Sequence, residues 1–209
     1  MKKSTKPVKL AILASGGGTN AGNFMAYFKN HPGINVALII SNNPSAYVLE
    51  RAAAAGIPAR VIRGSQWEDH AHVKGVFREF DIDALVLAGY MKLVPSWVIK
   101  MFAGKVFNIH PALLPAYGGK GMYGMHVHRA VLEAGASHSG ITIHLVNEEY
   151  DKGPILFQKK IEIADNETPE SLAAKIHELE YQYYPRIVES TLTARSKATC
   201  QQRGTKCRA

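Results

Sequence analysis

Cysteine is scarce in this sequence. Of 209 residues only Cys200 and Cys207 are cysteines, and both lie in the last ten positions. No disulfide framework can therefore organise a core, which favours a reducing compartment and predicts a cytoplasmic protein. The two thiols are expected to be free.

Long apolar runs are also missing. No stretch approaches the ~20 residues that a membrane span needs, so no membrane partner is expected. Residues 1–15 carry basic side chains before a short apolar segment, as a signal peptide does. Lys9 interrupts that segment and a glycine loop follows it, which suits a first buried strand better.

Negative charge is absent from both ends of the chain. Residues 1–9 and 195–209 hold nine Lys and Arg and no Asp or Glu, whereas residues 10–194 hold sixteen basic and seventeen acidic residues. The net charge of +8 therefore belongs to the tails, and the body is near neutral. A nucleic-acid partner needs a basic surface on the folded body, so none is expected.

Short apolar runs alternate with amphipathic stretches from residue 8 onwards, which is typical of βα units and an α/β fold with a mostly parallel sheet. The expected strands are residues 8–14, 36–40, 60–62, 84–88, 106–109, 140–146 and 155–163. The expected helices are residues 21–29, 45–55, 67–80, 95–102, 127–134 and 170–193, the last with a break at Pro185. Residues 1–195 are predicted to form one domain, and residues 196–209, where the periodicity fails, a basic disordered tail.

A glycine-rich segment, Ser15 to Asn20 (SGGGTN), lies between the first expected strand and the first expected helix. Glycines let a backbone approach an anion closely, and a helix N-terminus offers free N–H groups. The second strand ends in Ser41-Asn42-Asn43, without the acidic residue that a dinucleotide site requires. The segment therefore favours a phosphate monoester, and the alternative is a tight turn without a ligand.

Asn108 and His110 are two residues apart in an extended segment, so their side chains leave the same face. An amide donor beside an imidazole suits acyl transfer, in which a negatively charged oxygen forms and a proton moves. Asp151, in a turn punctuated by glycine and proline, is the best placed carboxylate to charge the imidazole. A structural histidine and a surface turn are the alternative.

The other histidines do not predict a metal site. His70 with His72, and His126 with His128, are i,i+2 pairs that diverge on a helix, and His144 lies in a strand. The sequence contains no HExxH motif, and no cysteine accompanies any histidine inside the expected fold. No metal is therefore expected.

Three motifs in this order, LASGGGTN, FNIHPALLPAYGG and HLVNEEYDKGPIL, resemble those of the phosphoribosylglycinamide formyltransferase family over about residues 9–190. The resemblance implies a single-domain Rossmann-like fold over residues 1–195, with helices on both faces of the sheet. It implies an enzyme of purine biosynthesis that moves the formyl group of 10-formyltetrahydrofolate to the primary amine of glycinamide ribonucleotide. Formylglycinamide ribonucleotide and tetrahydrofolate would be the products.

The same resemblance implies the role of each site residue. Gly18, Thr19, Asn20 and Glu180 would bind glycinamide ribonucleotide. The folate co-substrate would contact Met91, Lys92, Leu93, Val94, Asn108, Asn147 and His70. Asn108, His110 and Asp151 would be catalytic, with Asn108 and a protonated His110 stabilising the oxyanion. Burial lowers and a nearby carboxylate raises the pKa of a histidine, and the sequence does not decide which effect wins at His110.

The chain departs from the common family pattern at three places. Ala112 stands where serine is usual, so a bond normally made by that hydroxyl must be made otherwise. His70 stands where many members carry arginine, which weakens the expected contact with the folate tail. Residues 119–125 form a longer glycine-rich segment, expected to be an extended flap in which Lys120 is a candidate contact for the substrate phosphate or the folate glutamate.

Three alternative functions remain in view. A 10-formyltetrahydrofolate hydrolase and a methionyl-tRNA formyltransferase share the trio, but those relatives carry an additional N-terminal or C-terminal domain for which this chain has few residues. A phosphate-binding module without catalysis would leave the trio unexplained. A monomer and a homodimer are both compatible with the sequence.

Overall fold

The computed structural model describes residues 6–204, with side chains up to residue 194. Seven strands form one sheet in the order β3-β2-β1-β4-β5-β6-β7, parallel from β3 to β5 and antiparallel from β5 to β7. The strands are β1 (Val8–Ala14), β2 (Ile34–Ser41), β3 (Ala59–Val61), β4 (Ala84–Leu87), β5 (Val106–His110), β6 (His138–Leu145) and β7 (Ile155–Glu162). The predicted α/β fold with a mostly parallel sheet is confirmed.

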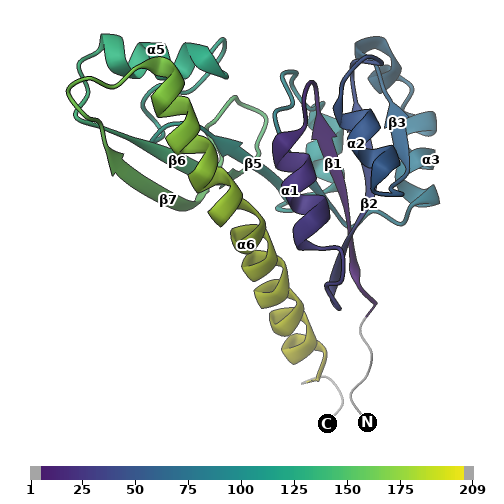
Figure 1. Ribbon diagram of the computed structural model, residues 1–209. Helices are drawn as coiled ribbons and strands as arrows, with labels where there is room; N and C mark the ends of the chain where they lie inside the picture. Colours follow the sequence, from purple (N-terminus) through teal and green to yellow (C-terminus); the bar gives the residue numbers. More distant parts are fainter. Residues whose placement is uncertain (1–5, 205–209) are drawn as a thin grey trace.

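Helices cover both faces of this sheet (Figure 1). They are α1 (Thr19–Tyr27), α2 (Val48–Ala54), α3 (His70–Glu79), α4 (Ser96–Met101), α5 (Met125–Glu133) and α6 (Pro169–Gly204), with a short 3-10 helix η1 (Gly64–Glu68) before α3. In β1, Leu10 and Ile12 belong to the core that also contains side chains of α1, α2, α5 and α6, whereas Ala11 and Leu13 belong to the core that contains side chains of α3 and α4. This alternation is the period of two that a strand buried on both faces requires.

The centre of the sheet locates the site. β1 lies between β2 and β4, so the connections leaving β1 and entering β4 run to opposite sides. Ligands of open α/β sheets bind in the crevice beyond the carboxyl ends of the strands at such a point. The glycine segment follows β1, residues 88–94 follow β4, and Asn108 and His110 end β5.

The closing helix α6 differs from expectation. Pro185 lies inside it without ending it, and the helix continues to Gly204. On either side of the proline, Tyr184 and Val188 are fully buried, and the Tyr184 hydroxyl donates to the Leu87 carbonyl at 3.0 Å. This packing outweighs the ~3 kcal/mol that an internal proline costs. The predicted break is therefore wrong.

The predicted disordered tail is helical over residues 196–204, and residues 205–209 lie outside the described residues. Cys200 and Cys207 belong to the part of the chain whose side chains are not described. Within residues 6–204, none of the helices combines the length and apolar character needed to cross a membrane.

Candidate active site

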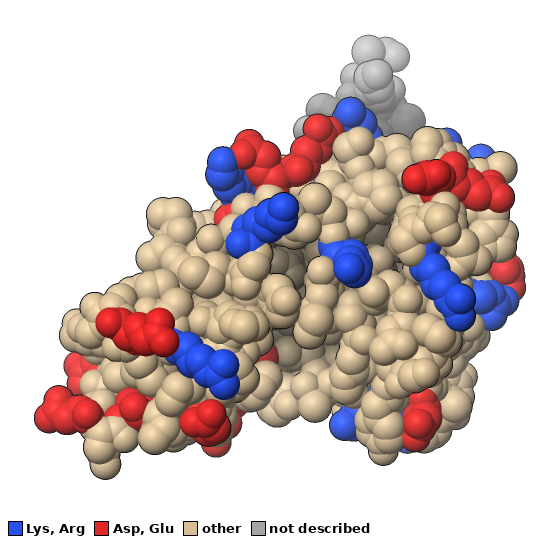
Figure 2. All heavy atoms as spheres, turned by 90° about the horizontal axis from the view of Figure 1, so that it is seen from above, with Lys and Arg blue, Asp and Glu red and all other residues tan. Residues whose placement is uncertain are grey.

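A cavity of about 660 Å³ opens at the carboxyl ends of the central strands. Figure 2 shows it as a hollow in the face seen from above, with Lys and Arg side chains beside it. Lys92 and Lys120 are the lysines that line it. The volume lies in the range of small-molecule sites, and the lining includes most of the residues predicted for the site.

One end of the cavity is the glycine segment before α1. Gly18 has a left-handed backbone (φ 67°), and a Cβ there would overlap the side chain of Val48, so only glycine fits the turn. No side chain caps the start of α1, which leaves its first N–H groups available to a ligand. Gly18, Thr19 and Asn20, the residues predicted to bind an anion, all line the cavity.

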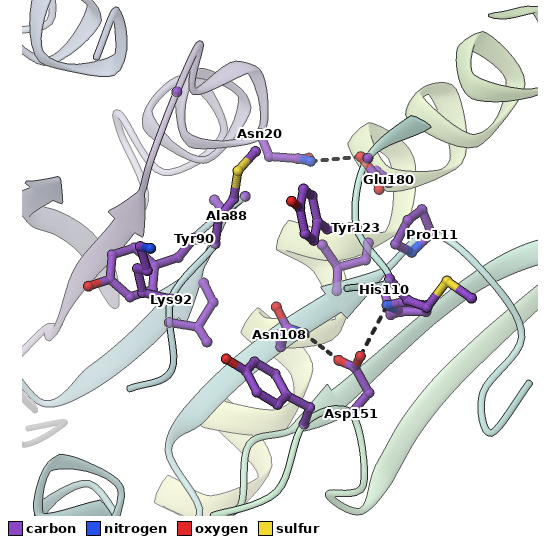
Figure 3. A pocket seen from close by; sticks show the side chains of 18 of the residues that line it. Asn20, Ala88, Tyr90, Lys92, Asn108, His110, Pro111, Tyr123, Asp151 and Glu180 are labelled. Carbon is purple, nitrogen blue, oxygen red and sulfur yellow. Dashed lines mark hydrogen bonds and ion pairs between the residues drawn. The ribbon is translucent and has the colours of Figure 1, made fainter. Parts of the chain in front are cut away.

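Glu180 on α6 faces this end and is 5% exposed (Figure 3). Its Oε2 accepts a hydrogen bond from Asn20 Nδ2 at 2.8 Å and lies 3.0 Å from His177 Nδ1. The carboxylate fixes the orientation of the Asn20 amide, so Asn20 Oδ1 is the atom left over. Within residues 6–204, buried Asn20 Oδ1 and buried His128 Nδ1 have no hydrogen-bond partner.

A second, more apolar part of the cavity follows β4. Met91, Lys92, Leu93 and Val94 line it, opposite the turn that contains Asn147. Ser15, at the start of the glycine segment, is hydrogen-bonded to the segment that follows β4. Its hydroxyl accepts from Met91 N–H at 2.9 Å and donates to Asn42 Oδ1 at 2.6 Å.

His70, predicted to contact the same ligand, is not among the cavity-lining residues. It begins α3, and its ring packs against Trp97 with centroids 4.5 Å apart. The predicted contact of His70 with the folate co-substrate stays a prediction.

The predicted trio comes together at the other end of the cavity (Figure 3). Asn108 Nδ2 lies 3.4 Å from Asp151 Oδ1, and His110 Nδ1 lies 3.6 Å from Asp151 Oδ2. His110 Nε2 donates to the Tyr117 carbonyl at 2.8 Å, and the Gly119 N–H donates to Asp151 Oδ2 at 2.9 Å. The antiparallel return through β6 and the turn after it carries Asp151 back to β5.

His144 is a fourth member that the motif analysis missed. It pairs with Asn108 across β5 and β6, and its Nε2 lies 3.1 Å from Asn108 Nδ2 and 3.6 Å from Asp151 Oδ1. Its Nδ1 lies 2.9 Å from the Leu145 carbonyl, which leaves Nε2 facing the Asn108 amide and the Asp151 carboxylate. Only the strand register, which the sequence does not state, places it there.

Burial decides the competition at His110. Burial lowers the pKa of the ring, and this effect outweighs the neighbouring Asp151 and the Tyr117 carbonyl, which raise it. Burial alone would raise the pKa of Asp151, but His144, the Gly119 N–H and His110 together lower it. At neutral pH the pair is therefore a neutral imidazole beside an ionised carboxylate.

Ala112 causes no gap in the site. Thr142 on β6 donates to the Ala112 carbonyl at 2.7 Å and accepts from the Leu114 N–H at 3.0 Å. Gln158 Nε2 donates to the Leu114 carbonyl and to Thr142 Oγ1, each at 2.9 Å. The segment after His110 is thus held without a hydroxyl at position 112.

The fold and site define an α/β enzyme in which a helix N-terminus and an Asn–His–Asp trio face one cavity. Within the described residues, no group of three or more histidine, cysteine, aspartate or glutamate side chains is arranged to hold a metal ion. A sequence model of the formyl transferase family matches residues 8–188, and the chain belongs to this family.

Several known proteins similar to this chain are named phosphoribosylglycinamide formyltransferase. Phosphoribosylglycinamide formyltransferase of Bacillus subtilis is 35% identical, with 88% of this chain and 94% of that protein aligned. The chloroplastic enzyme of Arabidopsis thaliana is 40% identical over 90% of this chain and 67% of its own length. The chain spans 60% of the corresponding Vigna unguiculata protein.

Solved structures agree with this description. Glycinamide ribonucleotide transformylase 1 from Geobacillus kaustophilus superposes with a TM-score of 0.81 at 34% identity, covering 89% of this chain and 99% of that one. The family resemblance of the three motifs is confirmed.

Proposed function

We propose that this enzyme transfers the formyl group of 10-formyltetrahydrofolate to the primary amine of glycinamide ribonucleotide in purine biosynthesis. The observation that carries the proposal is the position of the Asn108–His110–Asp151 trio. It lies in the same cavity as a free helix N-terminus and an apolar slot, so two ligands can meet beside it. The family and the named relatives support this reaction over formyltetrahydrofolate hydrolysis.

Glycinamide ribonucleotide, which accepts the formyl group, is assigned to the end of the cavity formed by Gly18, Thr19, Asn20 and Glu180. The amides at the start of α1 suit a phosphate, and the Glu180 carboxylate suits the hydroxyls of a ribose. Asn20 Oδ1 is an acceptor without a partner, which favours a ligand with O–H or N–H donors at this position.

The formyl donor is assigned to the slot formed by Met91, Leu93 and Val94. Apolar side chains suit the faces of a fused aromatic ring, and backbone groups of residues 91–94 can bind its polar edge. Lys92 and Asn147 line the same part of the cavity. The slot joins the trio at Asn108, which places a formyl group bound there beside the reacting side chains.

The trio supplies the proton transfers. His110 Nε2 is engaged by Tyr117, so Nδ1 is the nitrogen that takes a proton, and Asp151 then stabilises the imidazolium. The acceptor amine forms a bond to the formyl carbon, the carbonyl electron pair moves to oxygen, and the amine proton passes through water to the His110–Asp151 pair. Return of this proton to N10 lets the C–N10 bond break, and tetrahydrofolate leaves as a neutral amine.

Asn108 is assigned to the developing negative oxygen. Its 3.4 Å contact with Asp151 is longer than an ordinary hydrogen bond, so the amide N–H retains capacity for a better acceptor. One preorganised donor of this kind contributes about 3–4 kcal/mol to transition-state stabilisation.

The test uses purified protein with 10-formyltetrahydrofolate and with glycinamide ribonucleotide either added or omitted. We expect tetrahydrofolate to appear only when the ribonucleotide is present. Release of tetrahydrofolate without it would contradict the proposal in favour of a hydrolase, and turnover only with aminoacyl-tRNA would indicate a tRNA formyltransferase. The predicted cytoplasmic location stays a prediction.

A further inference from the structure

Two backbone groups, one just before the flap (residues 119–125) and one at its first residue, bind the two titratable residues of the trio. The Tyr117 carbonyl accepts from His110 Nε2 at 2.8 Å, and the Gly119 N–H donates to Asp151 Oδ2 at 2.9 Å. Asp151 Oδ2 is also the oxygen that faces His110 Nδ1 at 3.6 Å. One short chain segment, residues 117–119, therefore contacts both His110 and Asp151.

The backbone of this segment is unusual. Tyr117 (φ 55°) and Asp151 (φ 54°) are two of the three non-glycine residues with a left-handed backbone between residues 6 and 204. Such conformations persist only where surrounding contacts determine them. The contact of Gly119 with Asp151 joins the chain segment that contains Tyr117 to the second of these two positions.

Gly118 is packed directly against Asp151. A Cβ at this position would lie 2.5 Å from Leu114 Cδ2 and 3.3 Å from Asp151 Cβ. Gly118 does not have a left-handed backbone, so it is the close approach and not the local conformation that requires glycine here.

The residues that follow enter the cavity. Lys120, Met122 and Tyr123 line it, and Lys120 and Tyr123 are exposed to solvent in the absence of a ligand. Any ligand that contacts these side chains acts on the same short segment that holds His110 and Asp151.

We infer that Tyr117, Gly118 and Gly119 are positioning residues for the reaction, holding the His110–Asp151 pair in reacting geometry through the Tyr117 carbonyl and the Gly119 N–H. This inference rests on the proposed catalytic role of the pair. The other groups that face Asp151 are His110 and Asn108 from β5 and His144 from β6, while Glu180 on α6 acts on His110 from farther away.

The first experiment measures the contact without requiring activity. The titration of the Asp151 carboxyl is followed by carbon-13 NMR in the ligand-free protein and assigned with Asp151→Asn. Replacing the Gly119 amide by an ester removes its N–H with little change of shape. We expect the Asp151 midpoint to rise by about one pH unit, because the hydrogen bond stabilises the charged form. An ester at Gly121, whose N–H makes no such contact, is the control. An unchanged midpoint in the Gly119 ester would overturn the inference.

The second experiment measures turnover. In Gly118→Ala the new methyl group overlaps Leu114 Cδ2 and crowds Asp151 Cβ, so the Leu114 side chain, the segment or Asp151 must shift. We expect kcat to fall roughly ten- to a hundredfold with the KM of glycinamide ribonucleotide within about twofold. Gly121→Ala is the matched control, since it has a left-handed backbone (φ 89°) in the same flap and nothing within 4 Å of the new Cβ. It strains the backbone of the flap without bringing a new atom near Asp151, so we expect it to leave the Asp151 midpoint unchanged.

The outcomes separate the two proposals. Equal kcat losses in Gly118→Ala and Gly121→Ala, with the same Asp151 midpoint, would overturn the positioning role and indicate general strain in the flap. A wild-type protein that releases no tetrahydrofolate, whether glycinamide ribonucleotide is added or omitted, would contradict the proposed function instead. The carboxyl titration would still decide whether Gly119 holds Asp151.

Discussion

Two histidine–carboxylate pairs line the same cavity and behave in opposite ways. His177 lies 3.0 Å from Glu180 with its side chain 52% exposed, and its pKa is raised, chiefly by the hydrogen bond to that carboxylate. His110 lies 3.6 Å from Asp151 with its side chain 4% exposed, and burial lowers its pKa despite the carboxylate. Water and distance, and not the presence of a partner, determine the sign.

This difference in pKa suits the Glu180 end and the Asp151 end of the cavity to different functions. An imidazole that keeps part of its hydration takes up a proton more readily beside Glu180, and its charged form adds positive charge where a phosphorylated ligand is proposed to bind. A buried imidazole beside Asp151 is neutral until the reaction delivers a proton, and the carboxylate is already in place to stabilise it. One pair is therefore suited to binding and the other to proton transfer.

Asn108→Ala should have the largest effect and should act on turnover alone. Loss of one preorganised donor is expected to lower kcat by roughly 10²–10³, while calorimetry should find the affinity for glycinamide ribonucleotide within about threefold. Near-normal kcat in this variant would contradict the assignment of the trio end to catalysis.

Glu180→Gln should have the next largest effect and should act on binding. Hydrogen bonds to a charged group contribute about 1.5–3 kcal/mol, so the Kd of glycinamide ribonucleotide should rise roughly ten- to a hundredfold. The Kd of the formyl donor, measured in parallel, should not change. Equal losses for both ligands would show that Glu180 holds the fold of the cavity instead of one ligand.

The titration midpoints of His177 and His110 should both fall when the carboxylate beside each ring is replaced by an amide. In NMR titrations the His177 midpoint should lie above that of His110, and Glu180→Gln and Asp151→Asn should each lower the midpoint of the adjacent ring by about one pH unit. The sign follows because each carboxylate stabilises the imidazolium. A His110 midpoint above that of His177 would reverse the comparison.

His70→Ala should have the smallest effect. Its ring packs on Trp97 outside the cavity, so the KM of the formyl donor should change by less than about twofold. A tenfold increase in that KM would instead support the predicted contact between His70 and the folate co-substrate. Lys92→Ala, in the cavity wall, is the matched comparison for a residue that lines the slot.

Most of the architecture could be predicted from the sequence. The parallel strands are mostly apolar because both faces of the sheet are covered by helices, and the glycine segment and the Asn108–His110 motif keep their order whatever the register. The expected break at Pro185 failed because buried Tyr184 and Val188 hold the helix on both sides. Local propensity cannot include that packing.

The site, like the fold, has features that follow from the sequence and features that depend on tertiary contacts. The chemistry of the trio follows from the side chains in its motifs: an amide, an imidazole and a carboxylate can move a proton and stabilise an oxyanion wherever the chain brings them together. His144 joins them through an antiparallel register, and Tyr117 and Gly119 through backbone atoms that are the same in every residue type. The protonation state of His110 depends on how much water surrounds the ring. Burial and register are properties of contacts between distant segments, so they exist only once the chain has folded.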